Sequence, residues 1–70
     1  MGVDIQSLKN LMNEQSGGNY NAFARATGVN VSLLYRLLNG QAQAGVKTIN
    51  RLIVYIKQLG LRVEDYIFLR

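Results

Sequence analysis

Apolar residues recur along this chain at the three- and four-residue spacing of helices, and no segment alternates as a strand would. The first helix is predicted to begin after Asp4, whose side chain suits an N-cap. Ile5 and Leu8 lie on its apolar stripe. Gly17 and Gly18 are predicted to end it, because glycine adopts the left-handed conformation of a helix C-terminus at low cost.

Two shorter helices are predicted next. The first covers residues 20–26 and follows Asn19, and the second covers residues 31–38 and follows Asn30. Asparagine is a favoured N-cap because its side-chain oxygen accepts a hydrogen bond from the first helical turn. Gly28 ends the first of the two helices, so that only about three residues join them.

The remaining chain is predicted to form two more helices. Thr48 is expected to cap a fourth helix, which ends at Gly60. A short fifth helix is expected over residues 63–69, where Glu64 and Asp65 suit the positive end of the helix dipole. The sequence therefore predicts an all-α domain, built as a compact bundle of five short helices.

Length and composition narrow the class of protein. The chain has 70 residues, enough for one domain spanning 1–70, and 49% of them are hydrophobic. It lacks His and Cys, which excludes disulfides and the ordinary zinc sites. The longest apolar run covers residues 52–56, far short of the about 20 that cross a bilayer. We expect a cytoplasmic protein that does not bind membranes.

Catalysis is poorly supported by these residues. Acid–base and nucleophilic chemistry most often use His or Cys, and neither is present. The adjacent side chains of Glu64 and Asp65 diverge on a helix, and the glycines lie at element boundaries instead of forming a phosphate-binding loop. We therefore expect no enzyme, no metal site and no small-molecule cofactor.

Charge is distributed unevenly along the chain. The net charge is +4, and the four acidic residues lie towards the ends: Asp4, Glu14, Glu64 and Asp65. The acid-free span between them contains six basic residues: Arg25, Arg36, Lys47, Arg51, Lys57 and Arg62. Such a field favours a polyanionic partner. The alternative is that a modest basic excess only keeps a small protein in solution.

The helix over residues 31–38 has the most informative surface. At about 100° per residue, Leu34, Leu37 and Leu38 fall on one side and are predicted to anchor it in the core. The other side presents Ser32, Tyr35, Arg36 and Asn39, with Val31 at its start. Arg36 can donate two hydrogen bonds to guanine, and Val31 can contact a thymine methyl group. The alternative is that any amphipathic helix presents polar residues to solvent.

The stretch from Asn19 to Gly40, NYNAFARATGVNVSLLYRLLNG, resembles the Cro and phage-repressor type helix-turn-helix family, also called the xenobiotic-response-element type. The turn around Gly28 and the ending over residues 37–40 carry the likeness, and residues 59–67 resemble the close of that family's domain. The resemblance implies a lambda-repressor-like fold with a motif at about 19–40. It also implies a sequence-specific transcriptional regulator of double-stranded DNA, most simply a repressor of phage, mobile-element or antitoxin type, associated with the nucleoid.

The resemblance also implies roles for individual residues. By position, the family's groove-facing residues correspond to Asn30, Val31, Ser32, Tyr35 and Arg36. Its phosphate-contacting residues correspond to Asn19, Tyr20, Asn39, Gly40, Gln41, Gln43, Lys47 and Thr48. Two positions depart from the family's pattern: Tyr20 stands where many members have Gln, and Leu38 replaces a frequent Glu.

Surplus apolar residues predict a homodimer. Residues 66–69 are consecutive and apolar, so they cannot all enter one small core, and Val54 lies off the apolar stripe of its helix. The candidate interface residues are Val54, Tyr66, Phe68 and Leu69. The alternative function is a protein-interaction module that keeps this fold without specific DNA binding and contacts a partner protein through Leu33, Tyr35 and Leu38, or through the C-terminal apolar cluster.

Overall fold

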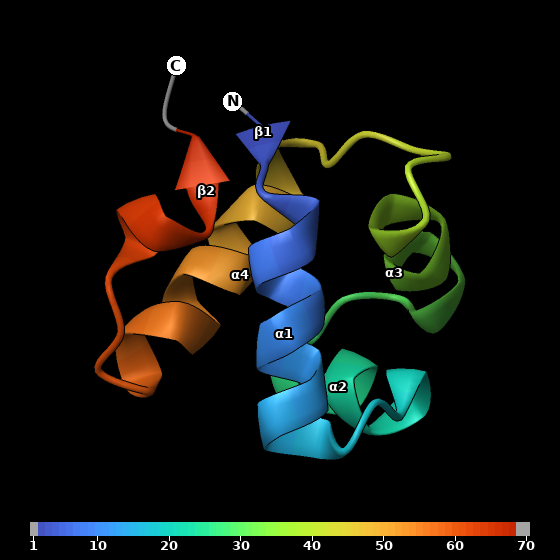
Figure 1. Ribbon diagram of the computed structural model, residues 1–70. Helices are drawn as coiled ribbons and strands as arrows, with labels where there is room; N and C mark the ends of the chain where they lie inside the picture. The colour runs from blue at the N-terminus through green and yellow to red at the C-terminus, as the bar shows by residue number, and fades with distance from the viewer. Residues whose placement is uncertain (1, 69–70) are drawn as a thin grey trace.

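The chain forms a small, mostly helical domain with a two-stranded sheet at one end (Figure 1). The computed structural model describes residues 2–68. Its four helices are α1 (Ile5–Ser16), α2 (Tyr20–Thr27), α3 (Val31–Leu38) and α4 (Val46–Gln58). A 3₁₀ turn, η1 (Val63–Asp65), follows them, and strand β1 (Gly2–Val3) pairs antiparallel with β2 (Ile67–Phe68). Within residues 2–68, no helix combines the length and apolar character needed to cross a membrane.

The first three helices begin where the sequence predicts. The side-chain oxygens of Asp4 and Asn19 each accept a hydrogen bond, at 3.1 Å, from the backbone N–H three residues further on. The Asn30 oxygen accepts from the N–H groups two and three residues on, at 2.9 and 3.3 Å. These bonds satisfy N–H groups that a helix leaves without an internal partner, so the local sequence determines each start.

The predicted start of the fourth helix is wrong. Helix α4 begins at Val46 after Gly45, and no side chain caps it. The backbone N–H of Ile49 already bonds to the carbonyl oxygen of Gly45 at 2.9 Å, so Thr48 lies inside the first turn. Thr48 is only 8% exposed. Burial against the core, which a capping rule does not consider, therefore sets the position of this residue.

Only the first turn of the predicted fifth helix forms, as the 3₁₀ turn η1, and the expectation that the domain is purely α-helical is wrong. After η1 the chain extends into β2, with Ile67 opposite Val3 and Phe68 opposite Gly2. The N–H of Asp4 donates to the carbonyl oxygen of Tyr66 at 2.8 Å, extending the connection between the two ends. Ile67 is buried and Phe68 exposed, which is the alternation of a strand. The last predicted helical residue, Leu69, lies outside the described residues.

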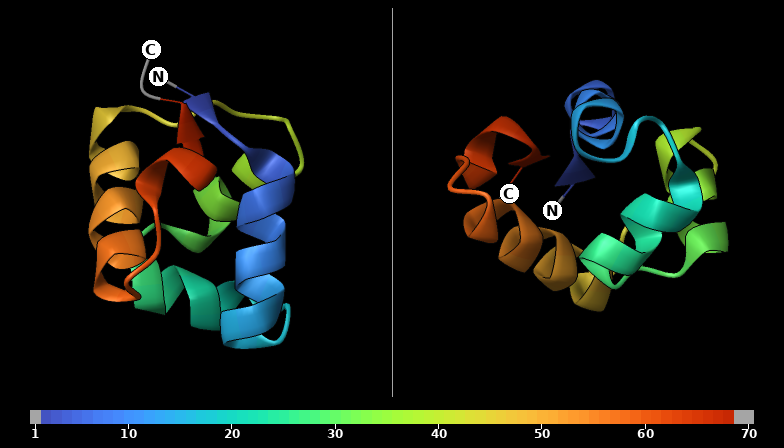
Figure 2. Two further views of the ribbon diagram at one scale, coloured as in Figure 1. Left: turned by 60° about the vertical axis from the view of Figure 1, so that its left-hand side comes forward. Right: turned by 90° about the horizontal axis from the view of Figure 1, so that it is seen from below.

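The core lies between the four helices and is closed by β2. Its largest fully buried side chains come from every helix and from β2: Leu8, Leu11, Phe23, Leu34, Leu38, Ile49, Leu52, Ile56 and Ile67. Phe23 of α2 meets Tyr55 of α4 edge-on, with ring centroids 5.5 Å apart. Burial raises the pKa of the Tyr55 hydroxyl. Figure 2 shows α2 and α3 forming one side of the molecule and η1 the other.

The conformation of Gly28 and the hydrogen bonds of Arg51 and Thr27 stabilise the turn between α2 and α3. Gly28 adopts the left-handed conformation, with φ +79°, which disfavours any side chain. Its carbonyl oxygen accepts a hydrogen bond of 2.6 Å from Nη1 of Arg51, on α4. Within the turn, the hydroxyl of Thr27 donates to the carbonyl of Phe23 at 2.9 Å and accepts from the N–H of Val29 at 3.3 Å. These contacts fix the angle at which α3 leaves α2.

A comparison of two glycines tests the role of Arg51. Gly28 and Gly40 both have positive φ, but a Cβ on Gly28 would lie 3.1 Å from Nη1 of Arg51, whereas one on Gly40 would meet nothing within 4 Å. We expect Gly40→Ala to cost about 1–2 kcal/mol from backbone conformation alone. Gly28→Ala should cost about 1 kcal/mol more, because the guanidinium must shift from the carbonyl oxygen.

Urea unfolding followed by circular dichroism measures these costs. In an Arg51→Ala background the two glycine substitutions should become equally costly, since the contact that distinguishes them is gone. Equal costs in the parent chain would show that Arg51 does not hold the turn.

Candidate nucleic-acid interface

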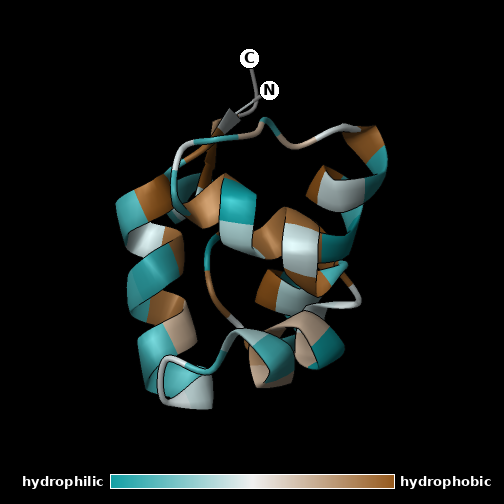
Figure 3. Cartoon of the chain, turned by 90° about the vertical axis from the view of Figure 1, so that its right-hand side faces the viewer, coloured by the Kyte–Doolittle hydropathy of each residue, from teal (hydrophilic) through white to brown (hydrophobic). Residues whose placement is uncertain are grey.

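Helix α3 divides into a buried side and an exposed side. Leu34, Leu37 and Leu38 are buried, as the sequence predicts. The exposed side carries Ser32, Tyr35, Arg36 and, directly after the helix, Asn39. Figure 3 brings α3 to the front and shows polar and apolar bands alternating along its ribbon. Because three leucines anchor so short a helix, its outer side is available for contacts with another molecule.

The side-chain hydrogen bonds on the exposed side of α3 differ in strength. The Asn39 amide donates to the carbonyl oxygen of Tyr35 at 2.7 Å, a good hydrogen bond. The Arg36 Nε lies 3.5 Å from the carbonyl oxygen of Ser32, which is a weak contact. Asn30 uses its side-chain oxygen to cap α3 and keeps its amide N–H groups as donors. The Arg36 guanidinium is therefore free to reorient towards a ligand.

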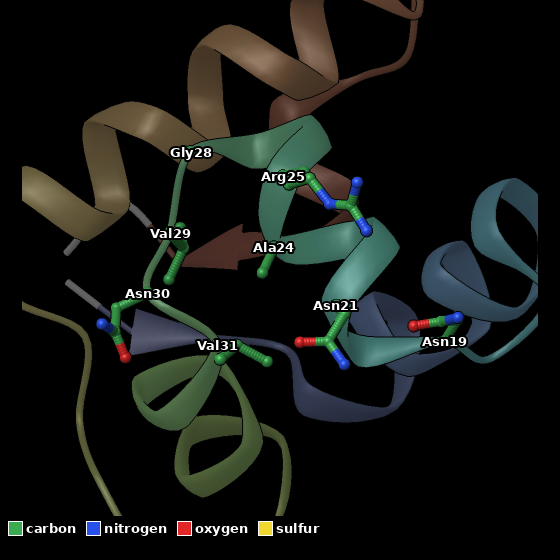
Figure 4. A pocket seen from close by; sticks show the side chains of 8 residues that line it. All are labelled: Asn19, Asn21, Ala24, Arg25, Gly28, Val29, Asn30 and Val31. Atoms are coloured by element: carbon green, nitrogen blue, oxygen red, sulfur yellow. The ribbon is translucent and has the colours of Figure 1, made fainter.

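A polar hollow of about 690 Å³ lies between α2 and the start of α3 (Figure 4). Its lining residues are Asn19, Asn21, Ala24, Arg25, Gly28, Val29, Asn30 and Val31. In Figure 4 the Asn21 amide and the Val31 side chain face each other across it. Three amides and one guanidinium, groups that hydrogen-bond to phosphate and sugar oxygens, line it together with the apolar side chains of Ala24, Val29 and Val31.

A second, smaller hollow of about 360 Å³ has aromatic walls and lies on the outer side of α3. Its lining residues are Tyr20, Val31, Ser32, Tyr35 and Arg36. The rings of Tyr20 and Tyr35 pack together, with centroids 5.1 Å apart and planes tilted by 58°. The sequence assigns these two tyrosines to separate roles. Their pairing depends on the angle between α2 and α3, so no local pattern reveals it.

The residues assigned to phosphate contacts flank α3 on two sides. Asn19 and Tyr20 begin α2, while Gly40, Gln41 and Gln43 belong to the connection between α3 and α4. Figure 1 shows α3 between the start of α2 and this connection. Lys47 is exposed in the first turn of α4, but the side chain of Thr48 is almost completely buried. Thr48 therefore offers little surface to a ligand, and Lys47 carries the charge at this position.

Four of the six basic residues in the acid-free span belong to α2, α3 and the first half of α4, and the other two are Lys57 and Arg62. In the part of the chain that the structure describes, the one ion pair joins Arg62 and Glu64, at 2.7 Å. The hydrogen bond from Arg62, and then its charge, holds the pKa of the Glu64 carboxyl below its ordinary value. Arg62 precedes η1 and Glu64 lies within it, and η1 is on the opposite side of the molecule from α3 (Figures 1 and 2). The basic residues Arg25, Arg36, Lys47 and Arg51 belong to α2, α3 and α4.

The residues predicted for the homodimer interface differ in how exposed they are. Val54 and Phe68 are both 55% exposed, whereas Tyr66 is half-buried and packs against the core. Leu69 lies outside the described residues. Leu38, suggested for contact with a partner protein, is completely buried and contributes nothing to any surface.

Within residues 2–68, no three acidic side chains come together in an arrangement that could hold a metal ion.

Comparisons with known proteins assign neither a family nor a function to this chain. Comparisons of the chain with models of protein families, with curated proteins and with solved structures each find no match.

Proposed function

We propose that this protein binds double-stranded DNA in a sequence-specific manner and regulates transcription, with α2 and α3 acting as a helix-turn-helix. The observation that carries the proposal is the exposed side of α3, which presents hydrogen-bonding, apolar and cationic groups together and has polar and basic segments on two sides. An α-helix of about 10–12 Å diameter fits a major groove of about 12 Å width. The resemblance to Cro and phage repressors indicates that the regulatory effect is repression.

The proposed contacts divide into base-reading and backbone-positioning groups. Arg36 would donate two hydrogen bonds to a guanine, with Ser32 and the Asn30 amide reading neighbouring base edges. Lys47 and the polar groups at the start of α2 would contact phosphates on either side of the groove. Since the span from residue 15 to residue 63 contains no acid, no negative side chain within it opposes the DNA backbone.

Three alanine variants separate these roles. Arg36→Ala should weaken the specific complex by about 1–3 kcal/mol and relax base preference at one position, because it removes a base contact. Lys47→Ala should weaken binding to all duplexes and reduce the slope of log K against log salt by about one, because it removes a phosphate contact. Fluorescence anisotropy over a series of salt concentrations measures both effects.

Arg62→Ala is the matched control, because it removes the same charge from the far side of the molecule. It should change neither base preference nor the salt slope, since a distance beyond the Debye length of about 10 Å screens its charge. If Arg36→Ala kept the full preference of the parent chain, α3 would not be the reading helix.

We also propose that two copies act as a symmetric dimer through the end that carries the two-stranded sheet. Phe68 is exposed on this sheet, and each described strand has only the other as partner, which leaves their outer edges unpaired. A two-fold axis near β2 would give a self-complementary interface. The two α3 helices could then occupy successive major grooves, roughly 34 Å apart.

Size-exclusion chromatography with light scattering tests the dimer. The parent chain should elute as a dimer and Phe68→Asp as a monomer, because a carboxylate would be buried without a partner. Leu61→Asp is the control: Leu61 is also exposed and apolar, but it lies in the loop after α4, at the end of that helix away from the sheet (Figure 1), and its variant should stay dimeric. A monomeric parent chain would end this proposal.

One observation favours a second function, that of a protein-interaction module. Tyr35 is 52% exposed and lines the aromatic hollow with Tyr20 and Val31. A protein partner could also cover this surface. The two functions differ in nonspecific DNA affinity, since a basic DNA-binding surface retains it at about 50 mM salt. Undetectable binding of any duplex under that condition would support the interaction module.

A further inference from the structure

The aromatic hollow on α3 has a composition that suits one feature of the major groove. Base edges there present hydrogen-bond donors and acceptors, and the single apolar group among them is the C5-methyl of thymine. A cytosine methylated at C5 presents the same group. Tyr20, Val31 and Tyr35 supply apolar walls, while Ser32 and Arg36 lie at the same hollow. The apolar walls therefore lie within the polar reading surface.

We propose that this hollow receives the 5-methyl group of a pyrimidine in duplex DNA, and that it makes the protein selective for 5-methylpyrimidines at one position of each half-site. The proposal rests on the proposed function and deepens it. Arg36 shares the hollow and carries the only charge in it, so the pyrimidine would lie beside the base pair that Arg36 reads. The charge of Arg36, with no acid among the lining residues, favours DNA as the occupant.

The hollow is preorganised, which makes selectivity for one methyl group achievable. Its walls come from two helices that pack against each other and against α1, and Arg51 donates a hydrogen bond to Gly28 in the turn between them. The rings of Tyr20 and Tyr35 already pack together, with centroids 5.1 Å apart, so they need little further ordering when a ligand binds. Val31 follows directly after the N-cap Asn30, so its place at the start of α3 is also fixed.

The polar hollow between α2 and α3 does not offer the same environment. It is lined by the amides of Asn19, Asn21 and Asn30 and the guanidinium of Arg25, and also by the apolar side chains of Ala24, Val29 and Val31. A methyl group there would displace water from polar groups without replacing its hydrogen bonds, which costs affinity. Val31 lines both hollows, whereas Tyr20 and Tyr35 line only the aromatic hollow, so the Tyr35 variants distinguish between the two.

The test begins with a duplex selected by the full chain from a random pool. Each thymine is replaced in turn by uracil, which removes only the methyl group, and each cytosine by 5-methylcytosine. We expect one position per half-site where removing the methyl weakens binding about fourfold, the value for burying one such group. Discrimination of thymine from uracil identifies thymine as the source of the methyl, and tighter binding of the methylated cytosine identifies 5-methylcytosine.

Substitutions of residues that line the aromatic hollow show whether this hollow causes the methyl selectivity. Val31→Ala and Tyr35→Ala should abolish the methyl effect, whereas Tyr35→Phe, which keeps the ring, should preserve it. Lys47→Ala should weaken binding to methylated and unmethylated duplexes equally and leave their ratio unchanged. Urea unfolding of each variant checks that the fold is intact.

The outcomes separate this inference from the proposed function. Specific DNA binding with no methyl effect at any position would overturn the inference and leave the function standing. A methyl effect that survives Val31→Ala and Tyr35→Ala would also overturn it, because another surface would be responsible. Absence of any duplex binding at about 50 mM salt would overturn both.

Discussion

The packing of three leucines of α3 in the core, together with the hydrogen bond from Arg51 to the carbonyl oxygen of Gly28, determines how this domain presents its third helix. The bond joins α4 to the turn between α2 and α3, three elements that are otherwise connected through packing. A left-handed glycine gives the turn its direction, and the guanidinium of Arg51 holds the exposed carbonyl group of that glycine. The polar hollow and the aromatic hollow both depend on the resulting angle, because each has walls from α2 and α3.

Local chemistry was sufficient to predict much of the fold. The starts of α1, α2 and α3 depend on caps that reach only two or three residues along the chain, and the buried side of α3 depends on leucines one turn apart. Such interactions are visible in the sequence because both partners lie within a few positions of each other. The sequence likewise identified the exposed side of α3, although the roles assigned to its residues remain predictions.

The features that the sequence did not predict all depend on partners far away in the chain. The acids at the start of residues 63–69 predicted a helix there, but the backbone of β1 supplies hydrogen-bond partners for residues 66–68. Thr48 has the chemistry of a cap, but burial in the core places it within α4. The contact of Tyr20 with Tyr35 follows from an interhelical angle that no periodicity encodes. Capping and spacing rules describe neighbours, so they cannot determine these arrangements.

The pairing of β1 with β2 has a consequence for the order in which the molecule assembles. Helices α1 to α3 make contacts between neighbouring segments, whose loop-closure entropy is small. The strands, in contrast, join the first described residues to the last, across the whole chain. During synthesis Ile67 emerges after the other core residues, so the side of the core that it covers stays open to water until then. We therefore expect the ribosome-bound chain to expose apolar surface at this end, where chaperones would bind it.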